Sequence, residues 1–590
     1  MTGFLRRGAD AAAIPLGYLA LAVAASWPLA RDFATYTIGD VYYDERHAIW
    51  VLWYTAQALA GRVSWPDTTH LLFPHGISVL VDGVGPLNGL LALPFWPWGA
   101  AAAFNGAALL GLTLSGWSLY ALAREVGIDR RAAFVAGGLF LLWPIHLIAL
   151  TGHLEKLFVG LLPLALLAGL RAFDPARSKW WLAAPGGALV GTLLQNGNQF
   201  VFAALGLALI APQTWLAAPR AERSTRAARI ALAGAASIAI CGPLLWSIVQ
   251  VMRDPTLEVA LGLHARYYSP DVLSLILPSP RQWWATWLFP ADGPVRDFTW
   301  TSSLPVLNGT AEWYGTGLET AVAIPLTALA LCVWGWRTPA ARLWIVFGLA
   351  FAVLCLGPRL RVGGTMTTVR LPYVVLQRVP GLDVMRTPGR FMLLGSIGFA
   401  MGAGLGLDAL IRRRPRQARV IAAAAAVLAA AECWPKPWPQ TALPPVPEFY
   451  QRLAADRSGG AVLDLPEGVD RHTDRSSAYM YFQTIHGYPI AWAYLSRRHL
   501  RYPNAGLEGL WRDDAPAGPA LRSRLRALGY RYVVLHRYPQ TFLGGRVADG
   551  FLGRPFGTQT VPGDERLIRE AFAGEAPVHT DRQVMVWALR

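Results

Sequence analysis

The chain is organised around residues 39–54, which read Gly-Asp-Val-Tyr-Tyr-Asp-Glu-Arg-His-Ala-Ile-Trp-Val-Leu-Trp-Tyr. They follow directly on an apolar run, Ala11–Ala30, that is long enough to cross a membrane. Asp40, Asp44 and Glu45 place three acids within six residues of a protein with 37 acids, and His47 comes three residues after Asp44. Two interpretations follow: an interfacial loop with an aromatic belt and solvated charges, or a site at a membrane face where one acid acts as a general base.

The composition predicts a polytopic α-helical membrane protein. Of 590 residues, 54% are hydrophobic and 15% are charged, whereas soluble domains contain about 25% charged residues. The net charge is +16, but the basic residues lie in short clusters between apolar runs, so nucleic acid is not an expected partner. Four cysteines fall in or beside apolar runs without metal-ligand spacing, so neither a zinc site nor a disulfide framework is predicted.

Eleven apolar runs are predicted to span the membrane, beginning with Ala11–Ala30 as an uncleaved anchor behind Arg6 and Arg7. Residues 86–98 are apolar but short and broken by prolines, and are predicted to be re-entrant or interfacial. The other ten spans lie near 102–123, 132–150, 157–170, 180–194, 200–216, 230–250, 318–336, 343–356, 391–410 and 420–434.

The distribution of basic residues predicts the orientation of these spans. With the amino end in the cytoplasm, the even-numbered spans end in five short basic loops, as the positive-inside rule requires. An odd number of spans then places the carboxyl end outside, and a full span at residues 86–98 would turn every basic loop outward. The loops contain Arg124/Arg130/Arg131, Arg171/Arg177/Lys179, Arg220/Arg223/Arg226/Arg229, Arg337/Arg342 and Arg412/Arg413/Arg414/Arg416/Arg419.

The predicted domain organisation has three parts. Residues 1–434 form a transmembrane domain whose main outer-face loops are 31–85, 251–317 and 358–388. Residues 435–447 are proline-rich and are predicted to be a linker. Residues 448–590 contain short strand-like runs and a basic helix, and are predicted to fold as an α/β domain outside the membrane.

The outer segments also carry candidate phosphate and substrate ligands. Arg386 and Arg390 lie in Arg-Thr-Pro-Gly-Arg just before a span, and either contact lipid headgroups or form a clamp, since guanidinium presents paired donors to phosphate oxygens. His153 and Glu155 lie in a loop of about six residues, too short to leave the bilayer surface. No Walker A, GxSxG, HExxH or GxGxxG motif is present, which argues against nucleotide, serine-hydrolase, zinc-protease and dinucleotide chemistry.

Several loose motifs resemble those of large bacterial GT-C-type membrane proteins, including the YfhO-like group, over nearly the whole chain. They are Gly39-Asp40…Asp44…Trp50-Val-Leu-Trp53, Leu72-Phe-Pro-His-Gly, Pro86-Leu-Asn-Gly-Leu, Gly152-His-Leu, Glu312-Trp-Tyr-Gly-Thr-Gly, the run from Val379 to Phe391, and Leu528-Gly-Tyr-Arg-Tyr-Val-Val. Asp44-Glu45 resembles the acidic pair of protein O-mannosyltransferases and aminoarabinose transferases. The chain departs from similar proteins at Glu155-Lys156, where they often have a neutral pair.

The resemblance implies a glycosyltransferase at the outer face of the bacterial plasma membrane that uses a polyprenyl-phosphate sugar as donor and a glycan, lipid or protein as acceptor. Asp44, or its rival Asp40, would accept a proton from the acceptor, with Glu45 and His47 beside it. Some relatives need a divalent metal at this loop, for which Asp40 and Asp44 would be the ligands. The remaining predicted substrate- or phosphate-binding residues are Arg386, Arg390, Arg266, His153, Glu155 and Lys156.

Two other classes of function stay open. A transporter or flippase of a lipid-linked saccharide would use the same arginines without a base. Against it, the spans show no inverted repeat and few intramembrane acids, Glu319 and Glu432 being the only candidates. A non-catalytic scaffold in envelope assembly is the third alternative.

Overall fold

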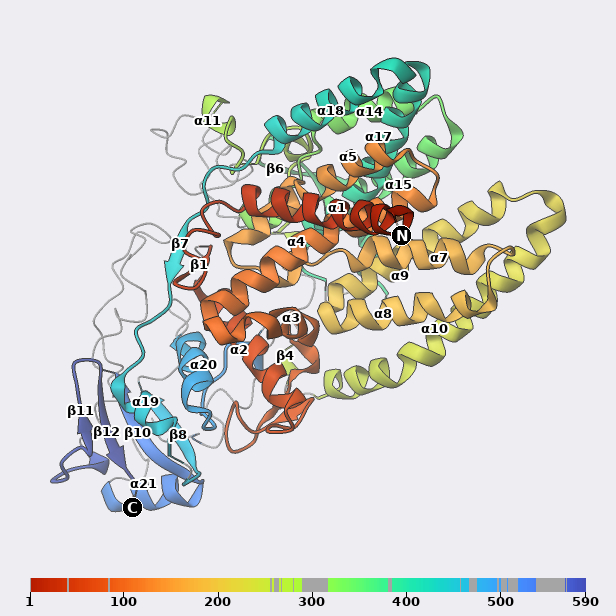
Figure 1. Ribbon diagram of the computed structural model, residues 1–590. Helices are drawn as coiled ribbons and strands as arrows, with labels where there is room; N and C mark the ends of the chain where they lie inside the picture. Colours follow the sequence, from red (N-terminus) through yellow and green to blue (C-terminus); the bar gives the residue numbers. More distant parts are fainter. Residues whose placement is uncertain are drawn as a thin grey trace. The chain divides into compact units, whose positions relative to one another are not determined.

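The computed structural model shows a predominantly helical chain that divides into two compact units (Figure 1). The first unit contains residues 1–31, 106–246 and 260–439, and the second contains residues 32–105, 247–259 and 440–590. The structure describes residues 2–39, 42–82, 85–254, 257–258, 265–266, 268–279, 281–288, 317–379, 382, 385–456, 458–465, 475–495, 498–499, 507, 518–536, 568 and 570–589.

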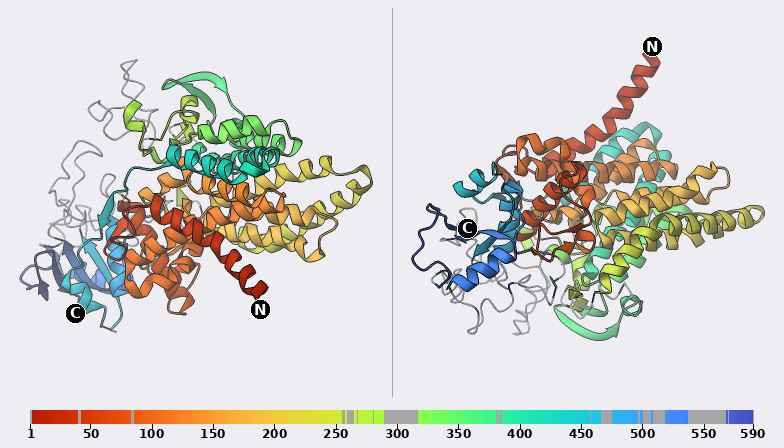
Figure 2. Two further views of the ribbon diagram at one scale, coloured as in Figure 1. Left: turned by 45° about the horizontal axis from the view of Figure 1, so that its top comes forward. Right: turned by 90° about the horizontal axis from the view of Figure 1, so that it is seen from below.

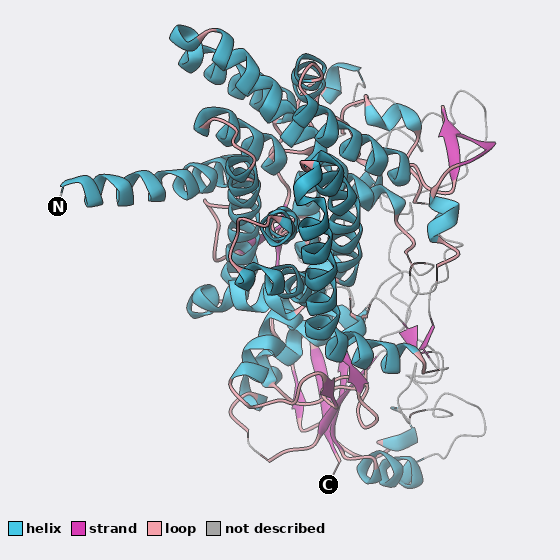
Figure 3. Ribbon diagram, turned by 90° about the vertical axis from the view of Figure 1, so that its right-hand side faces the viewer, coloured by secondary structure: helices cyan, strands magenta, loops and turns pink. Residues whose placement is uncertain are grey.

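The first unit is predominantly helical (Figure 3), and described helices occupy at least part of each predicted span, although the count of eleven stays a prediction. Five described helices are long and apolar enough to cross a membrane, or six if the bent pair Arg130–Leu141 and Pro144–Thr151 counts as one span. The protein is therefore a multi-pass membrane protein. The helices are α1 (Thr2–Ala25), α4 (Ala100–Glu125), α5 (Arg130–Leu141), α6 (Pro144–Leu147), α7 (Leu161–Phe173), α8 (Ala184–Gln195), α9 (Gly197–Ala217), α10 (Arg223–Met252), α13 (Gly317–Thr320), α14 (Leu326–Gly335), α15 (Pro339–Cys355), α17 (Met392–Arg413) and α18 (Ala418–Cys433).

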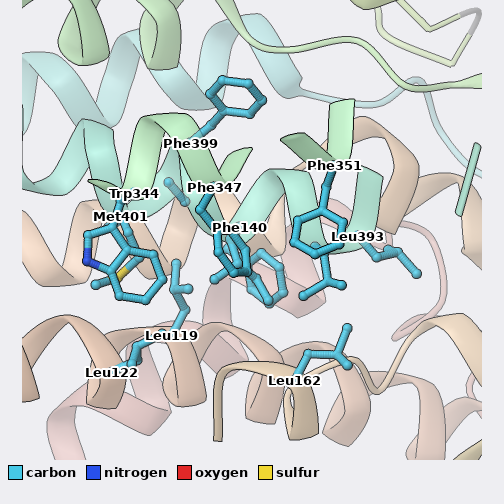
Figure 4. Close-up of a cluster of buried hydrophobic side chains, with 14 of the residues drawn as sticks. Leu119, Leu122, Phe140, Leu162, Trp344, Phe347, Phe351, Leu393, Phe399 and Met401 are labelled. Atoms are coloured by element: carbon cyan, nitrogen blue, oxygen red, sulfur yellow. The ribbon is translucent and has the colours of Figure 1, made fainter. Parts of the chain in front are cut away.

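Helix α17 lies at the centre of this unit, where it packs against α5, α14, α15 and α18. Its glycines allow backbones to approach closely: a Cβ added at Gly398 would lie 2.4 Å from the amide nitrogen of Gly348 in α15. Small residues at such crossings are typical of helix packing in membranes. Figure 4 shows Phe140, Phe347 and other large side chains filling the space between the helices.

Other helices of the unit turn apolar side chains outward. Only 11% of the most apolar window of the segment 220–252 is buried, compared with 83% for the segment 388–413. Ile238 and Leu232 on α10, Val333 on α14 and Val420 on α18 are all more than half exposed. Exposed apolar side chains on these helices fit contact with lipid chains.

The five basic loops lie at one end of the first unit. Glu125 pairs with Arg171 and Arg177, each at 2.6 Å, and Arg229 donates to the carbonyl of Ala172 at 2.7 Å. The backbone amide of Asp129 donates to Asp408, which also pairs with Arg412. The guanidinium groups of Arg337 and Arg413 both lie over the ring of Trp334. Loops widely separated in the sequence thus lie at the same end of the unit, as the predicted orientation of the spans requires.

The second unit contains a small sheet with the strand order β11-β12-β10-β8. Strands β8 (Ala461–Leu465) and β10 (Tyr530–His536) are parallel, whereas β12 (Val584–Ala588) runs antiparallel to β10 and to β11 (His579–Thr580). Helices α19 (Glu448–Leu453), α20 (Arg475–His486) and α21 (Gly518–Ala527) accompany the sheet.

The N-terminal part of the second unit differs from the predicted loop 31–85. Residues 42–59 form helix α2 (Tyr42–Leu59), which packs against α20. Trp50 of α2 is fully buried and donates to the side chain of Gln483 at 2.6 Å. The apolar positions of this stretch therefore face protein, because a partner helix more than 400 residues away covers them.

Two more segments, residues 86–98 and the predicted linker, contain regular secondary structure. Residues 86–98 form α3 (Pro86–Ala92) and a 3-10 helix, Leu93–Trp98. Within the predicted linker 435–447, strand β7 (Gln440–Ala442) pairs with β1 (Tyr36–Ile38). The second unit thus contains segments from several parts of the sequence, residues 32–105, 247–259 and 440–590, rather than residues 448–590 alone.

A buried polar network lies at the carboxyl ends of β8 and β10. The hydroxyl of Tyr450 contacts Asp464 and lies 3.0 Å from Nε2 of His536, which is itself 3.0 Å from Asp464. His486 stacks on Tyr450, and its Nδ1 accepts a hydrogen bond from the amide of Tyr488. Among the described residues, Nε2 of His486 has no hydrogen-bond partner. Burial lowers the pKa of His486 to about 4, despite the opposing effect of the Asp464 carboxylate.

Because His486 is buried in its neutral form, we expect the second unit to lose stability in mild acid. The unfolded chain binds a proton at His486 with a pKa near 6.5, whereas the folded chain does not until about pH 4. Stability should therefore fall as the pH drops from about 6.5 to 4, by about 3 kcal/mol at most. Hydrogen exchange of α20 in the full chain, corrected for intrinsic pH dependence, should accelerate over this range. His486→Gln, which is neutral throughout, should remove most of the acceleration, and an unchanged pH profile would contradict the assignment.

Candidate functional site

Asp44 lies in the first turn of α2 and is half-buried. Its Oδ1 accepts a hydrogen bond from the hydroxyl of Tyr494 at 2.8 Å. The ring of Tyr494 also packs edge-on against His47, with the ring centroids 5.8 Å apart. The aromatic side chain thus holds the carboxylate in one orientation while part of it remains accessible. Both residues belong to the second unit.

The neighbouring candidates are engaged in buried contacts. Glu45 is 1% exposed, and its Oε1 contacts the hydroxyl of Thr37. His47 lies 2.6 Å from Asp82 through Nε2, and both side chains are nearly inaccessible. These contacts fit a role in fixing the first turns of α2. Asp40, the rival base, lies outside the described residues.

The first unit contains a buried cluster of charges contributed by three loops. Glu319 of α13 accepts from Lys156 at 2.7 Å and from Arg390 at 2.7 and 3.1 Å through two guanidinium nitrogens. His153 lies 3.0 Å from Glu155 through Nδ1. The side chains of Lys156 and Glu319 are 3% and 6% exposed, so water screens little of their attraction. Of the predicted site residues, Lys156 and Arg390 therefore pair with Glu319, and His153 pairs with Glu155 in the loop that carries Lys156. The sequence indicated Glu319 only as a candidate coupling residue of a transporter.

Local geometry explains why these residues meet. Arg390 lies in a 3-10 turn, Pro388–Phe391, directly before α17. A Cβ at Gly389 would lie 1.9 Å from the carbonyl oxygen of Glu319, so only glycine allows the turn to pack against α13. Gln199 Nε2 donates to the carbonyls of Glu155 and Phe158, which closes the loop before α7.

The cluster lies far from the basic loops. Helix α17 begins just after Arg390 and ends at Arg413, and its 22 residues correspond to about 33 Å. Helix α7 likewise follows Lys156 and carries Arg171 in its last turn. The charge cluster and the basic loops are thus separated by about the thickness of a bilayer hydrocarbon core.

The two remaining predicted arginines are exposed. Arg386 lies four residues before Arg390, in the same loop, and Arg266 offers its backbone carbonyl to Arg361 at 3.2 Å. All of these arginines belong to the first unit, whereas Asp44 belongs to the second. Among the described residues, no group of three or more His, Cys, Asp or Glu could hold a metal ion.

The chain is similar to several solved glycosyltransferase structures. The arabinofuranosyltransferase AftD from Mycobacteria is 18% identical, with a TM-score of 0.48 and coverage of 98% of this chain and 39% of AftD. ArnT from Cupriavidus metallidurans bound to undecaprenyl phosphate is 13% identical, with a TM-score of 0.41 and 98% coverage of both chains. The oligosaccharyltransferase AglB from Archaeoglobus fulgidus, in complex with an inhibitory peptide and a dolichol-phosphate, is 14% identical, with a TM-score of 0.44 and coverage of 89% and 69%.

No protein-family model and no curated protein matches the sequence. The chain spans about two fifths of the length of AftD. At TM-scores below 0.5 these likenesses do not define an activity.

Proposed function

We propose that this membrane protein is a glycosyltransferase that moves a sugar from a polyprenyl-phosphate donor to a glycan, lipid or protein acceptor at the outer face of the bacterial plasma membrane. The observation that carries the proposal is Asp44, a half-buried carboxylate oriented by Tyr494 on the helix that follows the first span. The direct test compares sugar transfer by Asp44→Asn with that by the wild type.

Asp44 would act as the general base. An acceptor hydroxyl or amine would lose its proton to the carboxylate as its oxygen or nitrogen attacks the anomeric carbon of the donor sugar. The bond from that carbon to the phosphate oxygen would break, and the lipid phosphate would leave as an anion. A leaving group that is stable as an anion requires no general acid, so a single carboxylate is sufficient.

The phosphate would be stabilised by the arginines of the loop before α17. Arg390 is already held by Glu319, so Arg386, which is exposed, is the better candidate for direct contact, together with Arg266. Arg390 and Lys156 would keep the loop in position, and their charges would add to the field on the departing phosphate. His153 and Glu155 would line the acceptor side, and residues 448–590 would select the acceptor.

The outer location follows from the positive-inside rule. If the five basic loops lie in the cytoplasm, the charge cluster at the other end of α7 and α17 lies at the outer face. A polyprenyl-phosphate donor at that face would present its phosphate at the level of the exposed arginines.

One observation favours a second candidate, a transporter of a lipid-linked saccharide. The ion pairs of Glu319 with Lys156 and Arg390 are buried between helices of the first unit, and paired, buried ionisable residues in membrane proteins often mark substrate or ion pathways. A transporter requires no base, so it would keep its activity in Asp44→Asn, whereas the transferase would lose it.

Tyr494 predicts a specific loss of transfer rate. In Tyr494→Phe the carboxylate of Asp44 loses the hydrogen bond that orients it, so kcat should fall by roughly 10-fold. The KM for the donor should change little, because Tyr494 is not assigned to donor binding. Tyr488→Phe, in the same unit, is the control and should keep the wild-type kcat. An unchanged kcat in Tyr494→Phe, or an equal loss in Tyr488→Phe, would contradict the assigned role.

A further inference from the structure

A short hairpin joins the ends of two central helices of the first unit. Strands β5 (Arg359–Val362) and β6 (Thr365–Arg370) follow α15 and precede the turn that starts α17 (Figure 2). Since α15 ends and α17 begins here, and the two helices pack against each other, the hairpin lies at the end of both helices that is opposite to the basic loops.

The hairpin is held firmly on its inner side. The amide of Gly364 in the turn donates to Asp271 at 2.7 Å, and the buried Arg361 donates to the carbonyl of Arg266 at 3.2 Å. The amide of Leu371 donates to the carbonyl of Pro358 at 3.0 Å, which closes the base of the hairpin. Its outer surface is therefore presented in a fixed position.

The hairpin and the residues that follow it expose apolar and cationic side chains. Val362, Val369, Val375 and Val379 are 43%, 51%, 62% and 42% exposed. Arg370 and Arg378 are exposed among them, and residues 359–382 contain four arginines and no acid. Ordinary water-facing hairpins carry mixed charges on such a face. Exposed valines beside arginines fit a surface that is apolar on one side and anionic on the other.

The register adds an independent observation. Arg359 and Arg370 are directly paired across the two strands. Like charges in opposite cross-strand positions repel each other and destabilise a hairpin. In the part of the chain that the structure describes, neither arginine forms an ion pair. An anion held between the two guanidinium groups would convert this repulsion into paired, charge-assisted hydrogen bonds.

We infer that the hairpin 359–370 and the following residues to Val379 bind an anionic phospholipid of the surrounding bilayer. The phosphate diester lies between Arg359 and Arg370, and the valines contact the upper acyl chains. The proposal commits to a bilayer lipid because a soluble phosphate would leave the row of exposed valines unexplained. It is independent of the transfer reaction, since it requires neither Asp44 nor a donor sugar.

The test uses the full-length protein in nanodiscs and a fluorescent reporter. All four native cysteines are buried, so Val369→Cys introduces a single accessible thiol for an environment-sensitive dye. Discs contain phosphatidylcholine alone or with phosphatidylglycerol. The dye is expected to shift to the blue only in discs with phosphatidylglycerol. In detergent, Arg359→Gln/Arg370→Gln should weaken binding of short-chain phosphatidylglycerol by roughly 30-fold.

The matched control is Arg526→Gln/Arg582→Gln, which removes the same charge from exposed positions of the second unit and should leave lipid binding unchanged. Three results would overturn the inference. They are a dye emission typical of water in both kinds of disc, an equal blue shift without phosphatidylglycerol, or displacement of the lipid by millimolar inorganic phosphate. Loss of lipid binding with transfer intact would separate this inference from the proposed function.

Discussion

Asp44→Asn is expected to reduce sugar transfer by about 10²- to 10⁴-fold, the range that a general base usually contributes. Asparagine keeps the shape of the side chain and can still accept from the Tyr494 hydroxyl, but it cannot take the acceptor proton. The protein should therefore insert and fold normally. The measurement is the initial rate of transfer by purified protein in lipid, at equal amounts of folded protein.

Asp67→Asn is the matched control for this change, because Asp67 is an exposed acid of strand β2 (Asp67–Thr68) in the same unit. It should retain the wild-type rate. Asp40→Asn distinguishes the two rival bases: a large loss there, with Asp44→Asn active, would move the role to Asp40. Full activity in both variants would reject a base in this stretch and favour a transporter or a scaffold.

Glu319→Gln is expected to destabilise the protein by about 3–5 kcal/mol. The change removes the carboxylate that pairs with both Lys156 and Arg390, which are neighbouring buried cations. Removing one partner of a buried ion pair typically destabilises a protein by this amount. Thermal unfolding in detergent, followed by tryptophan fluorescence, should show a much lower midpoint and a lower yield of folded protein.

Two further variants show whether the loss of stability in Glu319→Gln comes from uncompensated buried charge. Asp408→Asn removes an acid whose partner Arg412 is 67% exposed, so it should change stability by less than about 1 kcal/mol. Combining Glu319→Gln with Lys156→Met removes one of the stranded cations and should recover part of the loss. If Glu319→Gln were as stable as Asp408→Asn, the charge cluster would not be what holds the three loops together.

The sequence was sufficient to predict most of the first unit. Apolar runs of membrane length marked the helices, and short arginine-rich loops marked one end, because both signals are local. Helix α2 was missed because its acids and aromatics resemble an interfacial loop, and its partner α20 lies more than 400 residues away. Strand β7 was missed for a similar reason: it pairs with a strand near the other end of the chain.

The candidate site was predictable in part. His153, Glu155, Lys156 and Arg390 were selected as charged residues in outer segments, and they do gather in the first unit. No local pattern revealed that Glu319 would join them, although a lone acid beside an apolar run requires a cation when it is buried. Tyr494 could not be predicted at all, because a tyrosine in a segment without special composition gives no sign of a distant carboxylate partner.

The most direct test of the central claim is the pool of lipid-linked sugars in cells. Cells that lack the protein are complemented with the wild type or with Asp44→Asn at equal membrane levels, and their polyprenyl-phosphate sugars are measured by mass spectrometry. A polyprenyl-phosphate sugar should accumulate in the deletion and in Asp44→Asn, and should return to a low level with the wild type. Equal pools with the wild type and with Asp44→Asn, both different from the deletion, would contradict transfer that depends on this carboxylate.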